Sequence, residues 1–357
     1  MKTFSKLTPP VYSAAVRAST TCLVTGGTGF IGRYVVRALH QRGVRVRLLT
    51  RRPAPAQTLF GDTVEIVTGD LRDPARVTAA CRDVASVIHL GAVYQFGRGA
   101  RHEMLATNIA GTQHLLQAAW HARVERFVHI SSSGVLVNHR TPVTETDFPT
   151  HVSLRQPYRH SKWRGELAAL EFAKRGLPVV IASPTSPLGA EDEAPTPTGR
   201  IVSDFLAGRF PFVARTMLNF VDVAELAAGI LAVADRGRCG ERYILANHNI
   251  WLGDFLRLLA RQTGQSAPRF SIPLGGILAG GVIGELAGSS RLCWETAWHC
   301  LRTQPFAVQK ATTELDWHAR VPLATSARAA IAWYRHRIVP SSLAPEPALA
   351  ATHAATS

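Results

Sequence analysis

Short apolar runs rich in valine, isoleucine and leucine recur along the first two thirds of the chain, with enough residues between them for a helix. They span 21–25, 44–50, 64–70, 86–91, 126–132, 178–184 and 241–247. Strands that alternate with helices are typical of a doubly wound parallel sheet. The pattern therefore predicts an α/β fold with such a sheet at its centre.

The first apolar run leads into TGGTGFIG (25–32) and then into an amphipathic helix that Gly43 is predicted to end. One face of this helix carries Ile31, Val35, Ala38 and Leu39. The glycines therefore lie where a strand turns into a helix, as in a Rossmann-type sheet, where the turn lets main chain approach a pyrophosphate. We expect these residues to bind a dinucleotide: Gly26, Thr28, Gly29, Phe30, Ile31 and Gly32. A tight turn without a ligand is the alternative.

Residues at the ends of the next three strands fit the same ligand. Arg51 and Arg52 stand where a carboxylate would select NAD(H), and a guanidinium matches a phosphate, so NADP(H) is favoured over NAD(H). The alternative is that both arginines point to water. Other cofactor contacts are expected from Asp70 and Leu71 after the third strand and from Leu90, Gly91 and Ala92 after the fourth.

The regular alternation ends after residue 185. A proline-punctuated loop spans 191–200, and 251–338 is predicted to be mainly helical, with an apolar stripe formed by Trp251, Leu252, Phe255, Leu258 and Leu259. We therefore expect an NAD(P)-binding domain at 20–185 and 220–250 and a smaller, mainly helical substrate region at 186–219 and 251–338. A flexible arm (1–19) and a disordered tail (339–357) are predicted at the ends.

The net charge of +15 comes mainly from arginine, since only five residues are lysine: Lys2, Lys6, Lys162, Lys174 and Lys310. Such a balance suits a phosphate-bearing cofactor, an anionic substrate or an anionic membrane surface, and no nucleic-acid-binding pattern accompanies it. The apolar stretch 272–288 holds six glycines and Glu285, so it is expected to form a helix of the second domain or to lie against a membrane.

Five cysteines without close pairing suggest neither a disulfide framework nor a metal site. A cytoplasmic location is expected, with contact to the inner face of the membrane left open. A small-molecule substrate is predicted as a partner, nucleic acid is not, and a homodimer is left open.

Candidate catalytic residues lie in YRHSK (158–162). Tyr158 and Lys162 are four residues apart and share one helix face, where an ammonium is expected to lower the pKa of the phenol from its usual value near 10. The cluster SSS (131–133) ends the fifth strand and can hold a substrate oxygen beside the tyrosine. Ser132 is the first choice and Ser133 the reserve, because the register of the strand is not fixed by the sequence.

These motifs, in this order, resemble the extended short-chain dehydrogenase/reductase superfamily over residues 20–338. TGGTGFIG, GDLRD (69–73), NIAGT (108–112), SSSG, YRHSK and PTSPLG (184–189) all carry the resemblance. The segments 195–211, 218–229 and 240–246 are similar to hopanoid-associated sugar epimerases and dihydroflavonol-4-reductase-like enzymes. Glycine at 91, where alanine is commoner, and GVLVN (134–138), where many sugar epimerases have tyrosine and glycine, depart from the pattern.

The resemblance implies that Ser132, Tyr158 and Lys162 are catalytic, with Asn108 supporting the lysine through water. It also implies that Lys162 holds the nicotinamide ribose and that Pro184, Thr185 and Ser186 lie against the nicotinamide. We therefore expect an NAD(P)(H)-dependent oxidoreductase that interconverts a carbonyl and a secondary alcohol. The alternatives are an NAD(P)-dependent sugar epimerase or dehydratase and a non-catalytic cofactor-binding protein. Candidate substrate contacts are Tyr94, Ser133, Arg200 and Arg215.

Overall fold

The computed structural model describes residues 18–94, 101–136, 141–210, 212–289, 293–301 and 303–338. The predicted tail lies outside the described residues, as does the predicted N-terminal arm up to residue 17.

Seven parallel strands form the central sheet, in the order β10-β6-β5-β4-β1-β2-β3. Their bounds are Thr21–Thr25 (β1), Arg45–Thr50 (β2), Val64–Thr68 (β3), Ser86–His89 (β4), Arg126–Ile130 (β5), Val179–Pro184 (β6) and Arg242–Leu245 (β10). Each strand falls within an apolar run of the sequence. The predicted doubly wound, Rossmann-type sheet is thereby confirmed.

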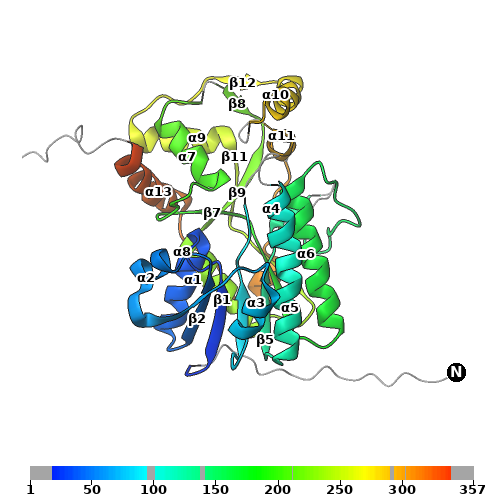
Figure 1. The fold of residues 1–357 in the computed structure, drawn as a ribbon. Coiled ribbons are helices and arrows are strands. Elements are labelled where there is room, and N and C mark those ends of the chain that lie inside the picture. Colours follow the sequence, from blue (N-terminus) through cyan, green and yellow to red (C-terminus); the bar gives the residue numbers. More distant parts are fainter. Residues whose placement is uncertain are drawn as a thin grey trace, which may run out of the picture.

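Helices cover both faces of this sheet (Figure 1). One face packs against α1 (Phe30–Gln41), α2 (Pro53–Phe60), α8 (Val223–Arg236) and α12 (Gln309–Leu315), and the other against α3 (Pro74–Ala80), α5 (Thr112–His121) and α6 (Pro157–Lys174). Alternate residues of a strand serve opposite faces: in β1, Val24 belongs to the first core and Leu23 to the second. Both cores therefore depend on the period-2 pattern of the strands.

Residues from late in the chain return to the first core. Ala311 and Leu315 of α12 are buried there together with Trp317, whose indole nitrogen donates to the Glu225 carbonyl at 3.1 Å. The domain boundaries expected from the sequence stay a prediction, but residues 309–317 pack with the nucleotide-binding half.

A second layer lies above the sheet in Figure 1. Its three-stranded sheet, β11-β9-β7, consists of β7 (Ser186–Leu188), β9 (Met217–Asp222) and β11 (His248–Trp251). Around it pack α7 (Pro197–Leu206), α9 (Leu252–Thr263) and α13 (Leu323–Ile338). Trp251, expected on a helical stripe, is instead the last residue of β11, and α9 starts directly after it.

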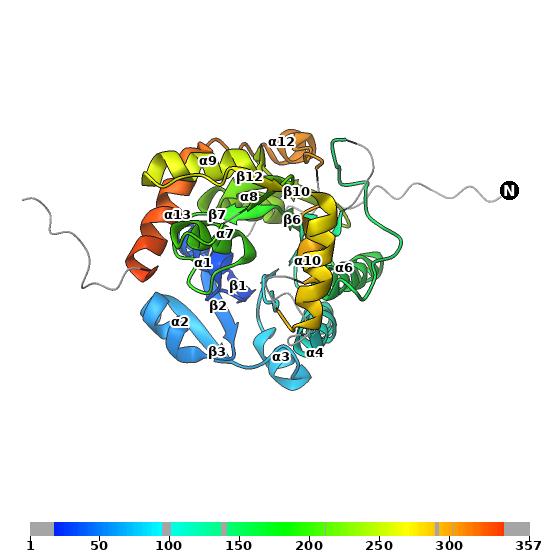
Figure 2. The same cartoon turned by 90° about the horizontal axis from the view of Figure 1, so that it is seen from above.

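The far end of this layer holds a strand pair and two helices. The pair is β8 (Phe212–Ala214) with β12 (Phe270–Ile272), and the helices are α10 (Leu274–Leu286) and α11 (Trp294–His299). Seen from above, α10 lies on the α4 and α6 side of the molecule (Figure 2). Among the described helices, none has both the length and the apolar character needed to cross a bilayer.

Candidate active site

The glycine turn between β1 and α1 has the geometry that a pyrophosphate needs. Gly26 has a φ of +72°, and a Cβ built on it would lie 2.7 Å from the Gly91 nitrogen. A Cβ on Gly32 would lie 2.1 Å from the Gly26 carbonyl oxygen. No side chain of the described residues caps the start of α1, and its first turn holds no acidic residue. The turn therefore fits the phosphates of a dinucleotide, with helix N–H groups free to face them.

Three ion pairs connect the loop after β7 to the first half of α1. The buried Arg33 guanidinium lies 2.9 Å from Glu193 and 3.5 Å from Glu191, and it also donates to the Thr28 carbonyl at 3.2 Å. Arg37, one turn later, pairs with Glu191 at 2.9 Å. The glycine turn is thus held against the second layer by charge.

Most predicted cofactor residues end strands at one edge of the sheet, as the sequence placed them. Arg51 follows β2 and pairs with Glu103 of α4 (Arg101–Leu105) at 2.7 Å, while Arg52, whose side chain is exposed, directly precedes α2. Asp70 pairs with Arg72 at 2.6 Å, which lowers the pKa of its carboxyl. At the next strand, Leu90, Gly91 and Ala92 follow β4.

Gly91, a departure from the family pattern, has a local explanation. A Cβ on this residue would lie 2.9 Å from the Thr25 hydroxyl and 3.0 Å from the buried Leu71 side chain. The same hydroxyl accepts from the Gly91 N–H at 3.0 Å and bonds the His89 ring at 2.7 Å. A side chain at 91 would therefore require the Thr25 and Leu71 side chains to shift.

The structure brings Ser132, Tyr158 and Tyr94 together. The side chains of Ser132 and Tyr158 are hydrogen-bonded, and the Ser132 hydroxyl also accepts from the Gly134 N–H at 3.0 Å at the start of a 3-10 turn (Ser133–Val135). Tyr94 lies against Tyr158, with ring centroids 4.3 Å apart. Of the serine cluster, Ser132 thus faces the tyrosine, whereas the Ser131 hydroxyl donates to Glu166.

The pKa of Tyr158 differs in direction from the expectation. Burial raises this pKa above its ordinary value near 10, the Ser132 hydrogen bond lowers it less, and the Glu295 charge raises it further. The Lys162 ammonium instead donates to the Ile130 carbonyl. The expected lowering by the lysine was therefore wrong for this structure, because desolvation is the largest influence on the phenol.

Lys162 itself is buried, with 7% of its surface exposed. Burial lowers its pKa to about 8, against the opposing effect of Glu166 one turn later on α6. The lysine therefore changes charge close to neutral pH, where an exposed lysine would stay protonated.

Asn108 lies in a π-helical segment (Ala106–Gly111) between α4 and α5, and its side chain joins three parts of the site. Its amide oxygen accepts from the Val93 N–H at 2.8 Å, and its amide nitrogen donates to the Val93 carbonyl at 3.0 Å and to Ser161 at 2.9 Å. Asn108 thus fixes the chain after β4 against α6. The water-mediated link to Lys162 stays a prediction.

Glu295 was not found from the sequence. It is a buried residue of α11 whose carboxylate accepts from the Arg159 N–H at 3.1 Å and the Tyr158 N–H at 3.5 Å. Burial raises its pKa to about 7. The start of α6, which carries Tyr158, is therefore capped by a residue more than a hundred positions away, and no local pattern could reveal this.

The remaining candidates are spread more widely. Arg200 of α7 is near enough to Tyr94 for its charge to act on that phenol, and its side chain donates to the Pro195 carbonyl at 3.2 Å. Arg215 lies over the Trp251 ring at 5.5 Å. Ser133 is buried. The Thr185 hydroxyl donates to the Leu245 carbonyl at 3.1 Å, and Pro184 and Ser186 are its neighbours in the chain. Their predicted roles stay predictions.

A cavity of about 530 Å³ opens beside the start of α6, between that helix, α4, α10 and α11. Apolar residues of its lining are Leu154, Pro157, Val282, Leu286 and Trp294. The charged residues of the lining are Arg101, Arg155, Glu285 and Glu295. Such a cavity suits an apolar molecule with a polar or anionic group.

Within the described part of the chain, no group of three or more histidine, cysteine or carboxylate side chains is arranged to hold a metal ion. The five cysteines, all described, are free thiols.

Comparison with known proteins agrees with this geometry. A model of the NAD dependent epimerase/dehydratase family matches residues 22–246. The chain belongs to this family. It is an enzyme of the extended short-chain dehydrogenase/reductase type, in which Rossmann-like sheets bind NAD(P).

Two relatives are 35% identical to this chain over the aligned residues. A putative dihydroflavonol 4-reductase of Synechocystis sp. matches over 70% of this chain and 75% of its own length. Sterol demethylase protein B of Methylococcus capsulatus matches over 71% of this chain and 77% of its own length. Among solved structures, a nucleoside-diphosphate-sugar epimerase from Pseudomonas aeruginosa superposes with a TM-score of 0.74 at 28% identity, covering 90% of this chain and 99% of that one.

Proposed function

We propose that the protein is an NADP(H)-dependent reductase that converts a ketone to a secondary alcohol. The observation that carries this proposal is the hydrogen bond between Ser132 and Tyr158 at the edge of the sheet beyond the glycine turn, with Lys162 one helical turn away. The site fits a carbonyl oxygen between two hydroxyl donors.

In this reaction Tyr158 is the acid. Its raised pKa keeps the phenol protonated at neutral pH, so it can donate its proton to the carbonyl oxygen, whereas alcohol oxidation would need the phenolate. Ser132 donates to the same oxygen and orients it. Lys162 holds the cofactor ribose, and a bound nicotinamide supplies the hydride.

Replacement of Tyr158 by phenylalanine tests the proposal. Y158F removes the proton donor and leaves the ring against Tyr94, so we expect ketone-dependent oxidation of NADPH to fall by about 10²–10⁴-fold. NADPH binding, measured by fluorescence, should stay within a few fold of the wild type. Y243F is the matched control, because Tyr243 lies in β10 and its hydroxyl bonds Glu314. Full activity in Y158F would contradict the proposal.

An epimerase is the second candidate, because the family and one solved relative carry that name. An epimerase takes a hydride from its sugar and returns it, so NADPH shows no net consumption. Stoichiometric loss of NADPH with a ketone therefore separates the two reactions.

The proposed substrate is a large apolar ketone of the polycyclic or isoprenoid kind. The apolar lining of the cavity at the start of α6 supports this, and one relative is named for a sterol reaction. We further propose that the protein approaches its substrate at a membrane surface, because Ile283 and Leu286 of α10 are 66% and 77% exposed. A homodimer stays a prediction.

A further inference from the structure

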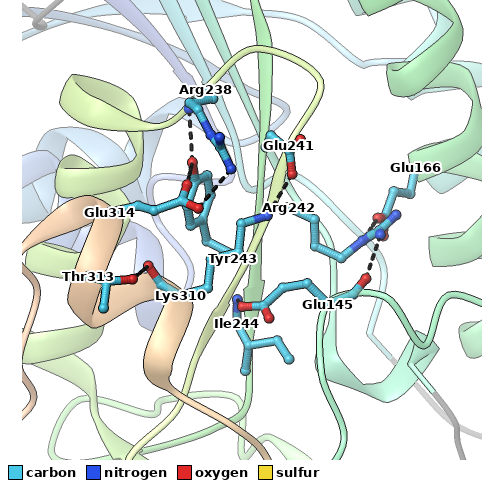
Figure 3. A network of polar contacts seen from close by, with 10 residues as sticks. All are labelled: Glu145, Glu166, Arg238, Glu241, Arg242, Tyr243, Ile244, Lys310, Thr313 and Glu314. Carbon is cyan, nitrogen blue, oxygen red and sulfur yellow. Dashed lines mark hydrogen bonds and ion pairs between the residues drawn. The ribbon is translucent and has the colours of Figure 1, made fainter.

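A buried chain of charged groups lies behind Lys162. Glu166 is one turn after the lysine on α6 and has no exposed surface. Its carboxylate accepts from the Ser131 hydroxyl and forms an ion pair with Arg242 of β10 (Figure 3). Arg242 also donates to the Glu145 carbonyl at 2.9 Å, which fixes the guanidinium from the other side.

The loop that carries Glu145 is in turn fixed to β10. The Glu145 carboxylate accepts from the Ile244 N–H at 3.0 Å, two residues after Arg242 (Figure 3). The described side chains that bond Glu166 are thus Ser131, which directly follows β5, and Arg242 of β10. Its carboxylate is therefore held in one place relative to Lys162.

We propose that Glu166, held by Ser131 and Arg242, is a positioning residue that keeps Lys162 charged and in place for the reaction. This inference rests on the proposed function, in which Lys162 serves Tyr158 and the cofactor ribose. Residues four apart on a helix lie on the same face, so the Glu166 charge acts on the nearby Lys162 ammonium in a low-dielectric environment.

Other titratable groups around Lys162 do not provide a negative charge. His89 of β4 and His129 of β5 are buried, and burial together with the Lys162 charge lowers the pKa of each, so both are neutral near pH 7. Tyr158 is protonated, and Arg242 is a cation. Among the described residues, Glu166 is the carboxylate whose charge acts on Lys162. Burial raises the pKa of the Glu166 carboxyl, and Arg242, Ser131 and Lys162 oppose that rise.

The charge of Glu166 can be removed with little change in shape. Glu166→Gln keeps an acceptor for Ser131 but takes away the anion that opposes desolvation of Lys162. We expect the midpoint of the Lys162 titration, about pH 8 in the wild type, to fall by about one pH unit or more. The lysine would then be partly neutral at the pH where the wild-type lysine is charged.

Because the chain has only five lysines, NMR of the protein labelled with ¹³C at lysine Cε can follow each of them. The Lys162 signal is assigned by its loss in Lys162→Arg. The expected result is a lower midpoint in E166Q, and NADPH affinity that weakens with rising pH at the same lower midpoint. E171Q is the matched control, because Glu171 is an exposed carboxylate on the same helix, and its midpoint should equal that of the wild type.

A folded E166Q that titrates like the wild type overturns the inference. If E166Q does not fold, E166Q/R242M leaves no unpaired arginine, and the same lower midpoint is expected. A purely structural role of Glu166 would lower NADPH affinity equally at every pH, without moving the midpoint. The proposed function fails separately, through the absence of ketone-dependent NADPH oxidation in the wild type, and the NMR midpoint does not depend on that activity.

Discussion

Arg51 and Arg52 are adjacent at the end of β2 but have different surroundings. Arg51 is held by Glu103 at 2.7 Å, and a phosphate would compete with that carboxylate for it. The exposed Arg52 directly precedes α2. Arg52 is therefore the better candidate to bind the 2′-phosphate that distinguishes NADP(H) from NAD(H).

Substitution at these positions should change the preference between the cofactors. In R52A we expect the Kd for NADPH to rise about 10- to 100-fold, since a charge-assisted hydrogen bond contributes about 1.5–3 kcal/mol, while the Kd for NADH changes little. E103Q should tighten NADPH binding by releasing Arg51. R45A, at the opposite end of β2, is the control. Equal weakening of both cofactors in R52A would contradict this assignment.

At the residue scale, local spacing was enough to find Tyr158 and Lys162 but not their electrostatics. Four-residue spacing identifies a shared helix face, and Glu166, four residues after Lys162, could have been found by the same rule. The direction of the Tyr158 pKa depends on burial and on Glu295, and both arise only when α11 packs on α6. No property of residues 158–162 predicts that.

Among the elements, α6 is the one whose position sets the geometry of the site. Pro157 begins this helix, and a distant carboxylate, Glu295, accepts from the N–H groups of its first turn. An acceptor at a helix N-terminus is favourable, but here it is buried, and the pKa of Glu295 is raised from 4.5 to about 7. The contact between α11 and α6 is therefore sensitive to pH.

The sign of this effect follows from proton binding. Between pH 4.5 and about 7 the folded state holds the Glu295 proton and the unfolded state does not, so the free energy of unfolding falls as pH rises. The contribution of this group is at most about 1.4 kcal/mol per pH unit. In E295Q, urea unfolding across this range should lack that slope, whereas E171Q should keep it. Parallel profiles of wild type and E295Q would contradict the shifted pKa.

Elements with a strong hydrophobic period were predicted well. The runs at 21–25 and 178–184 match β1 and β6 closely, because buried parallel strands are apolar on both faces. Trp251 was misplaced, since a strand residue that precedes a helix can fall on the helical apolar stripe by chance. The pairing of β8 with β12 joins segments far apart in the chain and leaves no local pattern.

At the scale of the whole molecule, α10 and the β8–β12 pair lie together at one end (Figures 1 and 2). These elements carry several large apolar side chains that are exposed. Large exposed examples are Phe212, Phe270, Val282, Ile283 and Leu286. The cavity beside the start of α6 is lined by two of them, Val282 and Leu286. A bilayer in contact with this end would therefore lie next to the cavity proposed for an apolar substrate.

Sedimentation with vesicles of anionic phospholipid tests the proposed membrane contact. Burial of a leucine or isoleucine side chain stabilises binding by about 1.5–3 kcal/mol, so I283S/L286S should reduce vesicle binding by about 10-fold or more. NADPH affinity should stay unchanged. L167S is the control, because Leu167 is an exposed leucine on α6. Equal sedimentation of the two variants would contradict a role for α10.

The sequence predicted the sheet and the order of the site motifs, but it did not predict that residues 309–317 pack against the central sheet. Trp317 packs in the core beside α8, where a Cβ on Gly229 would lie 2.8 Å from its ring. Residue 317 lies within a stretch expected to belong to the substrate region. A hydrophobic pattern predicts that a residue is buried. The surface against which that residue packs depends on the path of the whole chain.

The ion pairs between Arg33 and the carboxylates at 191 and 193 connect the first turn of α1 to the second layer. The Glu193 side chain is largely exposed, so dissolved ions can compete for it. Nucleotide release that requires the loop to move must first separate these charges. We therefore expect cofactor exchange to become faster as ionic strength rises, independently of the chemistry at Tyr158.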